Sequence, residues 1–427
     1  MTARLLPLAG FLVLTAAAPL AAQTSAAAAP EPAAALSQAA PAGAAVRLTP
    51  RPTLRLGTMV KVALTARVQG DLHAPGGTPG EMDFDVARRR VGVTGTLTSH
   101  LEFEVERELE DGGDWRDVFV NVRTVRAAQV QAGRFKMPFS REQLTGAGSL
   151  DFISRSRAAD LLAPGRSTGV AVHGRVARHV LGYDVGVFTG EGGVAPTAPD
   201  VTGFGPAVAG RVTLGPRGAA RRSGALSNIE FGLGATRGDV GAGRHSLRGR
   251  STSKDVFFSP VFVQGRRLRV GGDLDWRPGP FGFRAEYLRA DDARQHQGLM
   301  GETLPALRGQ GWYVSGVWAV AGRRAHAGAD DRLAFAGVNG LELAARVERV
   351  WFGTHGAADG SVRTPRSAGL PLVSDRAWTL GANWTLNRLV RLQLNAVLEQ
   401  VTDRARNAAQ VSGGWTWSPM ARVQIAM

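Results

Sequence analysis

The sequence of 427 residues contains no cysteine and almost no lysine. Without cysteine the chain can form no disulfide scaffold, no zinc–thiolate site and no thiol nucleophile. Only Lys61, Lys136 and Lys254 are lysines, so arginine supplies nearly all of the 51 basic residues behind the formal charge of +15. Two explanations for this excess stand side by side: a coding bias, and selection for the planar, permanently charged guanidinium that suits oxyanions.

Long apolar runs and catalytic motifs are also scarce. The mean hydropathy is −0.08, and each transmembrane helix needs about 20 apolar residues, so a bundle of membrane helices is excluded. The eight histidines are scattered without a His-x-x-x-His pair, and the chain has neither a nucleophile elbow nor a phosphate-binding glycine loop. We therefore expect no enzyme activity, no cofactor and no metal site.

The first 50 residues have the composition of an export signal followed by a linker. Arg4 precedes the apolar stretch 5–14, and the small residues of 16–22 offer a cleavage site, which predicts a signal peptide over residues 1–22. From 23 to 50, alanine and proline dominate and charge is nearly absent, which predicts an unpacked periplasmic linker. Residues 51–427 are then the folded domain.

Beyond the linker, apolar and polar side chains alternate with a period of two, the pattern of a two-faced strand. Glu102, Glu104, Glu106 and Glu108 alternate with other residues, and no amphipathic helix would place these four carboxylates on one side. Each such segment has roughly the 9 to 11 residues that a tilted membrane strand needs. We predict about 16 strands, over residues 54–70, 84–97, 100–109, 116–125, 127–137, 167–177, 180–190, 206–216, 227–237, 266–278, 281–290, 311–322, 339–352, 376–386, 390–401 and 412–427.

The gaps between these strands alternate in length. Those after odd-numbered strands are mostly long, such as 138–166 and 238–265, whereas those after even-numbered strands are mostly tight, such as 98–99. Outer-membrane barrels show this asymmetry, with short periplasmic turns at one rim and longer external loops at the other. The gap 323–338 departs from it. The sequence thus predicts an all-β fold, a transmembrane antiparallel β-barrel.

A soluble β-sandwich also has alternating strands, but its inward residues form an apolar core. Here one face carries arginine, aspartate, glutamate, asparagine and glycine, which suits a water-filled lumen. Tryptophans lie on the other face and mostly near strand ends, where an interfacial belt would place them. These are Trp276, Trp312, Trp318, Trp378 and Trp384. We therefore favour the membrane barrel.

Eight segments carry a resemblance to a known family. They are Arg88–Gly95, Gly133–Ser140, Ser154–Ser156, Pro164–Val170, Tyr183–Gly192, Gly311–Val314, Leu341–Arg346 and Thr379–Asn387. In their order along the chain they resemble the phosphate-selective porins O and P. The resemblance extends over about residues 54–427, and it is the order of the segments rather than any single motif that makes it specific.

The resemblance implies a trimeric channel in the cell outer membrane, with a third external loop folded into the lumen and basic residues lining an anion path. The gap 138–166 is the third gap after an odd-numbered strand and one of the longest, which agrees with this expectation. Candidates for the path and its constriction are Arg88, Arg90, Arg134, Lys136, Arg141, Arg155, Arg157 and Arg166, and further lumen-facing basic residues are Lys61, Arg67, Arg267, Arg269, Arg284, Arg346 and Arg391.

The same arginines have a second explanation, since pairing with lumen carboxylates across strands would also account for them. The stripe from Glu102 to Glu108 could neutralise Arg88 and Arg90 in this way. A ladder of arginines that face the lumen would instead give an oxyanion several binding sites of moderate depth, as conduction requires.

The predicted function is passive conduction of small inorganic anions, phosphate or a related oxyanion, across the outer membrane. The alternatives are a general diffusion porin with weak anion preference, and a non-conducting barrel that serves structure or adhesion. The expected partners are small anions, outer-membrane lipid and further copies of the chain in a homotrimer. Export and the barrel pattern argue against binding to nucleic acid.

Overall fold

The computed structural model describes residues 44–47, 51–57, 59–74, 82–110, 113–177, 179–190, 205–215, 228–321, 340–354, 364–402 and 414–427. The chain divides into two units, residues 1–41 and 42–427, and only the second contains described residues. The expected signal peptide and most of the expected linker therefore lie outside them. No helix in the described ranges is long and apolar enough to cross a membrane.

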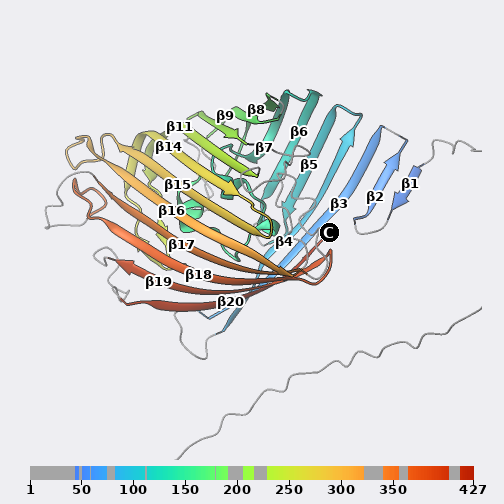
Figure 1. Cartoon of the computed structure of the whole chain (residues 1–427). Coiled ribbons are helices and arrows are strands. Elements are labelled where there is room, and N and C mark those ends of the chain that lie inside the picture. The colour runs from blue at the N-terminus through green and yellow to red at the C-terminus, as the bar shows by residue number, and fades with distance from the viewer. Residues whose placement is uncertain are drawn as a thin grey trace, which may run out of the picture. The chain divides into compact units, whose positions relative to one another are not determined.

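The second unit is a closed barrel of 16 antiparallel strands (Figure 1). Each barrel strand pairs with the next one along the chain, and the last pairs with the first, Met420 opposite His73. All 16 predicted strands form, which confirms the predicted fold. They are β3 (Val60–His73), β4 (Asp83–Leu97), β5 (Leu101–Glu108), β6 (Trp115–Val125), β7 (Ala128–Lys136), β8 (Arg166–Val176), β9 (Leu181–Phe188), β10 (Ala207–Leu214), β11 (Ile229–His245), β14 (Phe262–Trp276), β15 (Phe281–Arg294), β16 (Leu304–Ala321), β17 (Gly340–Thr354), β18 (Val373–Thr385), β19 (Val390–Thr402) and β20 (Thr416–Ala426).

The first predicted strand, 54–70, differs from the structure because the chain turns within it. Gly57 has a φ of +59°, a left-handed conformation that glycine adopts at little cost, and the turn separates β2 (Thr53–Leu56) from β3. Strand β2 pairs back onto the first residues of β3 and also with β1 (Ala44–Arg47). The end of the expected linker thus adds a short strand beside the barrel.

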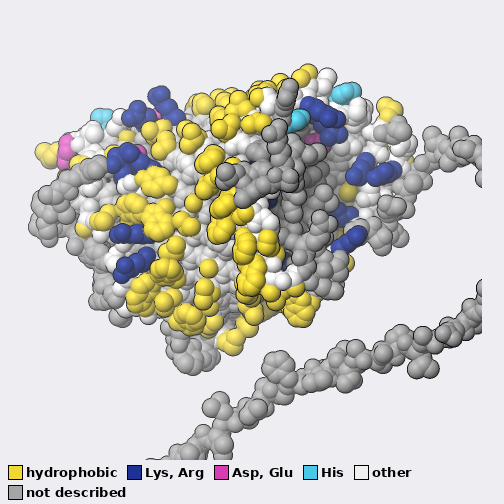
Figure 2. Space-filling model, in the orientation of Figure 1, with side chains coloured by type: hydrophobic (Ala, Val, Ile, Leu, Met, Phe, Trp, Pro, Cys, Tyr) yellow, Lys and Arg dark blue, Asp and Glu magenta, His cyan; other side chains and the backbone are white. Residues whose placement is uncertain are grey.

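Alternation along each strand separates an apolar outer face from a polar inner face. On β16, Val314 and Trp318 are 47 % and 46 % exposed, whereas Ser315 between them is buried. Trp378 and Trp384 are likewise about half exposed, and Figure 2 shows hydrophobic side chains spread over the outside of the barrel. Large exposed apolar side chains at this density are the mark of a surface that contacts lipid.

The connections have the predicted asymmetry at most positions. Tight turns join β4 to β5 at Thr98–His100, β14 to β15 at 277–280 and β18 to β19 at 386–389. The connection between β11 and β14 is long and contains two short strands, β12 (Gly249–Arg250) and β13 (Val256–Phe258). The exceptional gap 323–338 lies outside the described residues.

Candidate functional site

The third long loop, between β7 and β8, folds into the barrel as predicted. It contains α1 (Arg141–Leu144), a 3-10 turn η2 (Ala147–Ser149) and α2 (Arg157–Leu162). Serines cap both helices: the hydroxyl of Ser140 accepts from the N–H of Gln143 (3.2 Å), and that of Ser156 accepts from the N–H of Ala159 (3.2 Å). Such caps satisfy backbone donors at the helix starts that would otherwise remain unpaired inside the barrel.

Apolar packing fixes α2 against one side of the lumen. Leu162 and Ala158 are fully buried in a cluster with Phe352 and other residues of the barrel. Two glycines of β16 leave the space for this contact. A Cβ atom on Gly309 would lie 2.8 Å from the Cδ2 of Leu162, and one on Gly311 would lie 2.9 Å from the Cβ of Ala158. The helix therefore sits where the strand lacks side chains.

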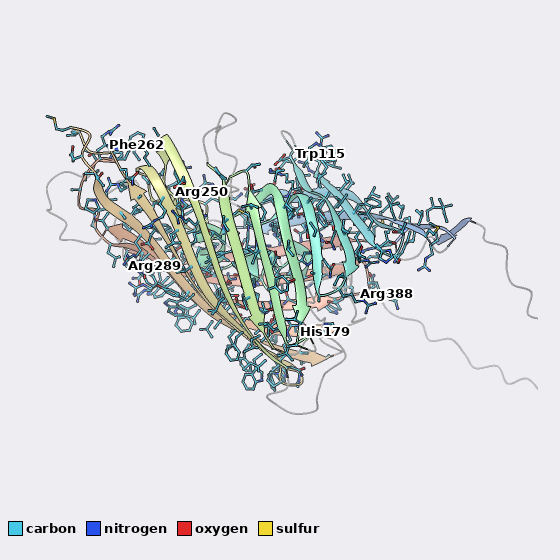
Figure 3. All side chains as sticks on the ribbon, turned by 90° about the horizontal axis from the view of Figure 1, so that it is seen from above. Trp115, His179, Arg250, Phe262, Arg289 and Arg388 are labelled. Atoms are coloured by element: carbon cyan, nitrogen blue, oxygen red, sulfur yellow. The ribbon has the colours of Figure 1, made fainter. Side chains whose placement is uncertain are left out.

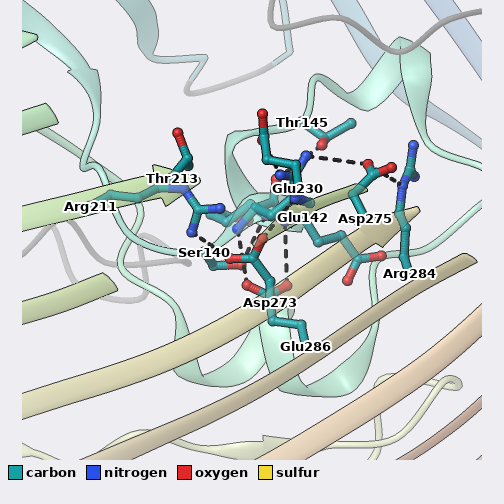
Figure 4. A network of polar contacts seen from close by, with 12 residues as sticks. Ser140, Glu142, Thr145, Arg211, Thr213, Glu230, Asp273, Asp275, Arg284 and Glu286 are labelled. Carbon is teal, nitrogen blue, oxygen red and sulfur yellow. Dashed lines mark hydrogen bonds and ion pairs between the residues drawn. The ribbon is translucent and has the colours of Figure 1, made fainter. Parts of the chain in front are cut away.

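Arg141 anchors the start of the loop in an acidic part of the wall, whose carboxylates Glu230, Asp273 and Asp275 are labelled in Figure 4. Its guanidinium pairs with Glu230 of β11 and with Asp273 (2.8 Å) and Asp275 (3.2 Å) of β14. Burial disfavours the charged form of Arg141, but these three carboxylates outweigh it and raise its pKa. Since the three carboxylates already surround it, Arg141 holds the loop in place more than it offers charge to a passing ion.

Arg157 is a second anchor, at the start of α2. Its backbone N–H donates to Glu348, and its guanidinium donates to the carbonyl of Ser251 (3.3 Å) and the hydroxyl of Thr252 (3.2 Å). Burial lowers its pKa, but the nearby carboxylates, of which Glu399 is the strongest influence, raise the pKa overall. Arg157 therefore ties the third loop to the β11–β14 connection.

Arg155 differs from both anchors although it lies on the same loop. It donates to the backbone carbonyls of Thr145 and Gln143, and its buried Nε has no hydrogen-bond partner among the described residues. Burial lowers the pKa of Arg155; Glu142 and Asp160 raise it, and the neighbouring arginines Arg166 and Arg90 lower it further. Neither carboxylate forms a salt bridge with Arg155 in the described structure.

The wall strand β4 contributes Arg88, which faces the same region. Arg88 donates to the amide oxygen of Gln69 (2.6 Å), and its electrostatic neighbours include Arg155 and Arg422 as well as Asp71. Arg90, on the same face of β4, forms the ion pairs that the sequence predicts, with Glu108 (2.6 Å) and Glu106 (3.5 Å). Arg88 and Arg155 are therefore two guanidiniums, one from the wall and one from the loop, with no carboxylate salt bridge in the described structure.

Two further cationic side chains extend this basic region. Arg67 of β3 lies against the 3-10 turn, since a Cβ on Gly148 would be 3.1 Å from its Nε. Arg116 of β6, which the alternating pattern does not single out, has Arg166 and Arg90 as electrostatic neighbours. The Nε atoms of Arg67 and Arg116 are buried, without a hydrogen-bond partner in the part of the chain that is described.

The inner face of the barrel is unequally covered. On the side of β14 and β17 the carboxylates Asp273 and Glu348 are each only 1 % exposed, beneath the loop. On β5 the side chains of Glu102 and Glu106 are 23 % and 14 % exposed. The more accessible part of the lumen is therefore the side lined by the first barrel strands, where Arg88 is half-buried and Arg90 is only 7 % exposed.

The remaining candidates occupy varied positions. Arg134 lies near the outer rim, pairs with Asp114 (2.6 Å) and is 36 % exposed; Arg166 pairs with Asp117; Lys136 donates to the carbonyls of Leu144 and Thr145. Three arginines form ion pairs: Arg267 with Asp292, Arg284 with Asp151 and Arg346 with Glu348. Arg391 donates to the carbonyls of Gly148 and Leu150. Arg269 is buried and Lys61 is exposed. The structure thus distinguishes basic residues that anchor the loop or pair with carboxylates from Arg88 and Arg155, which form no ion pair in the described residues.

Glu142 gives the docked loop a dependence on pH. Its carboxylate accepts from the N–H (3.1 Å) and the hydroxyl of Ser156, and Arg346 lies 3.6 Å away. Burial raises the pKa of Glu142, opposed mainly by Arg346 and Ser156. The docked loop therefore binds this proton more tightly than a released loop, so docking is strongest at acidic pH and weakens as pH rises through the raised pKa.

We expect the open-channel current to fluctuate more at about pH 7 than at about pH 4, because an ordinary glutamate is half protonated near the lower value. The variant Glu142→Gln keeps a neutral acceptor for Ser156 and should lose this pH dependence. Noise recordings on single channels at both pH values measure it. The same pH dependence in both proteins would show that another group controls the loop.

The sequence of the barrel identifies its family. The model of the phosphate-selective porin O and P family matches residues 62–421. The chain belongs to this family. The match confirms the resemblance seen in the sequence and covers all or part of each of the 16 barrel strands of this porin. Together, the family and the barrel point to the outer membrane. No curated protein matches the chain.

Solved structures of porins share the fold of this porin at low sequence identity. An anion-selective porin from Comamonas acidovorans is 14 % identical, with 86 % of this chain and 100 % of that chain covered and a TM-score of 0.53. The outer membrane channel DcaP of Acinetobacter baumannii is 11 % identical (86 % and 98 %, TM-score 0.54), and a trimer form of OmpT of Vibrio cholerae is 12 % identical (86 % and 100 %, TM-score 0.54). These likenesses show the fold.

Proposed function

We propose that this porin passively conducts small inorganic anions, phosphate or related oxyanions, along the side of its lumen lined by β3–β8. The observation that carries the proposal is the pair Arg88 and Arg155. They interact electrostatically, one from the wall and one from the loop, and each donates to neutral oxygens instead of a carboxylate. An oxyanion between them would compensate both charges.

The chemistry of the guanidinium fits this task. Its planar fork presents paired N–H donors to two oxygens of one oxyanion, which replaces part of the hydration shell. Arg90 and Arg166 continue the basic region but are each paired with a carboxylate. The accessible Glu102 and Glu106 keep the local potential moderate, and an ion that is bound moderately can leave again.

The wider context supports the remaining parts of the proposal. The family name, phosphate-selective porin, and a structural neighbour described as an anion-selective porin agree with anion conduction. A neighbour in trimer form supports assembly as a homotrimer. We further propose that residues 1–22 direct export to the outer membrane and that the chain is a channel and not an enzyme.

Inhibition of the chloride current by phosphate tests the proposal in a planar bilayer. We expect phosphate to reduce the chloride current of the unmodified porin with a saturating dependence on its concentration. The double variant Arg88→Lys/Arg155→Lys keeps both charges but loses the planar fork. It should retain its preference for anions over cations while phosphate inhibits its chloride current more weakly.

Three results would contradict parts of this proposal. Inhibition that does not saturate in the unmodified porin would indicate a general diffusion porin. Equal inhibition in the porin and its lysine variant would show that the two arginines do not recognise oxyanions by their geometry. A folded barrel that passes no current would indicate a structural or adhesive protein.

A further inference from the structure

The outer face of the barrel also carries arginines, on six consecutive strands from β11 to β18. They lie in the loop-side half of the strands, and Figure 2 shows basic side chains on this part of the surface between hydrophobic ones. On a lipid-facing surface, arginines beside aromatic residues lie at the level of the headgroups. These residues are Arg237, Arg266, Arg289, Arg308, Arg349 and Arg376.

Two neighbouring members of this group share a carboxylate. Arg289 of β15 contacts Asp291 (2.6 Å), and Arg308 of β16 contacts the other oxygen of Asp291 (2.7 Å). One anionic group thus bridges two arginines from adjacent strands. The arrangement shows that two guanidiniums on adjacent strands of this surface can bind one anionic group together.

The next pair along the barrel lacks such a bridge. Arg349 of β17 and Arg376 of β18 are direct cross-strand partners, and both are exposed. Each guanidinium lies over an indole ring, Arg349 over Trp351 (5.4 Å) and Arg376 over Trp415 (5.2 Å). Arg376 also donates to Gln400, whose amide is neutral. Neither arginine forms an ion pair with a carboxylate within the described ranges.

Like charges directly opposite each other on adjacent strands destabilise a sheet. The indole rings fix the two guanidiniums in place and contribute attraction of their own, but they leave two adjacent positive charges uncompensated. Among the described residues, therefore, no protein group takes the position that Asp291 occupies for the neighbouring pair. An anion from outside the chain would remove the repulsion.

We propose that Arg349 and Arg376 bind a phosphate group of an anionic lipid in the outer leaflet. The lipid is favoured over free phosphate because the pair stands on the outer, lipid-facing side of the barrel. Trp378, the next outward side chain on β18, is 55 % exposed and offers an apolar surface to an acyl chain. This site is separate from the lumen and does not depend on anion conduction.

Native mass spectrometry of the full chain in detergent tests the proposal, with lipid A, a diphosphorylated glycolipid, as the probe. Each arginine near an anionic lipid contributes about 1 kcal/mol, so Arg349→Gln/Arg376→Gln should weaken lipid A binding by about thirtyfold. The control, Arg107→Gln/Arg134→Gln, removes two arginines from another part of the barrel, near Trp115, which lies well apart from Arg289 in Figure 3. It should bind lipid A as the unmodified chain does.

Two further arms separate the sources of phosphate. Dephosphorylated lipid A should bind the unmodified chain no better than it binds the Arg349→Gln/Arg376→Gln variant, and inorganic phosphate in excess should leave lipid A binding unchanged. Displacement of lipid A by inorganic phosphate would instead assign the pair to free phosphate. Equal lipid A binding by the Arg349→Gln/Arg376→Gln variant and the unmodified chain would overturn the site. The shift in gel mobility on heating, which reports a folded barrel, verifies that each variant is intact.

Discussion

Replacement of Arg88 and Arg155 by alanine is expected to lower the anion preference of the channel by roughly tenfold to thirtyfold. A unit charge about 4 Å from an ion contributes about 1 kcal/mol even in bulk water, and each 1.4 kcal/mol is about a factor of ten. Both guanidiniums lack a carboxylate salt bridge in the described structure. Their loss therefore removes positive charge that no ion pair neutralises, while Arg67 and Arg116 remain in the same basic region.

The matched control is Arg134→Ala, which removes an arginine already paired with Asp114 near the outer rim. It should leave ion selectivity unchanged. Reversal potentials in a salt gradient compare the three proteins. If the Arg88→Ala/Arg155→Ala variant keeps the reversal potential of the unmodified porin, the two arginines do not govern selectivity, and the other arginines of the lumen would have to.

Replacement of Arg141 by alanine is expected to release the third loop and to enlarge the conductance. The substitution leaves Glu230, Asp273 and Asp275 without the guanidinium that joins them to the loop. Breaking a buried ion pair by removal of one partner costs about 3–5 kcal/mol, and neighbouring arginines such as Arg211 offset part of it here. Single-channel conductance and urea unfolding, followed by tryptophan fluorescence, measure both effects.

Gly311→Leu also displaces the third loop, by a steric clash instead of the loss of ion pairs. A side chain at this position would collide with Ala158 of α2, because even a Cβ lies 2.9 Å from the Cβ of Ala158. We expect this variant, like Arg141→Ala, to conduct more and to discriminate less between ions. Arg134→Ala breaks an exposed pair and should cost no more than about 1 kcal/mol. Unchanged conductance in both loop variants would contradict a constricting role for the loop.

The barrel could be predicted from the sequence because the period-two pattern is local. In every strand the alternation of apolar and polar residues indicates which residues face lipid, and sixteen strands with this pattern are enough to predict a closed sheet. The turn at Gly57 could not be read in this way, since alternation continues through residues 54–70. The pattern therefore joined two strands where the backbone reverses.

The roles of the arginines could not be predicted, because they depend on contacts across the barrel. Arg141 and Arg155 lie on one loop, yet the first meets three carboxylates of β11 and β14 and the second meets backbone carbonyls and other arginines. The chain separation between Arg141 and Asp275 is 134 residues, and no local pattern encodes such a contact. The fold of the loop decides which charges are neutralised.

Local irregularities explain two further differences. The register between β5 and β6 shifts between the pairs Val105–Val118 and Arg107–Trp115, so the alternation that identified Arg88 and Arg90 gave no inward assignment for Arg116. At Gly133 the φ is +131° although strand pairing continues on both sides, and the next residue, Arg134, pairs with Asp114 near the rim. A register shift like that between β5 and β6 changes the direction of a side chain without altering the hydrophobic pattern.

The sign of ion selectivity in the unmodified chain tests the central claim most directly. The purified porin is inserted in a planar bilayer between two concentrations of potassium chloride, and the potential at zero current is measured. The uncompensated guanidiniums of the accessible lumen predict a reversal potential set by chloride. A reversal potential near zero, or one set by potassium, would contradict the account.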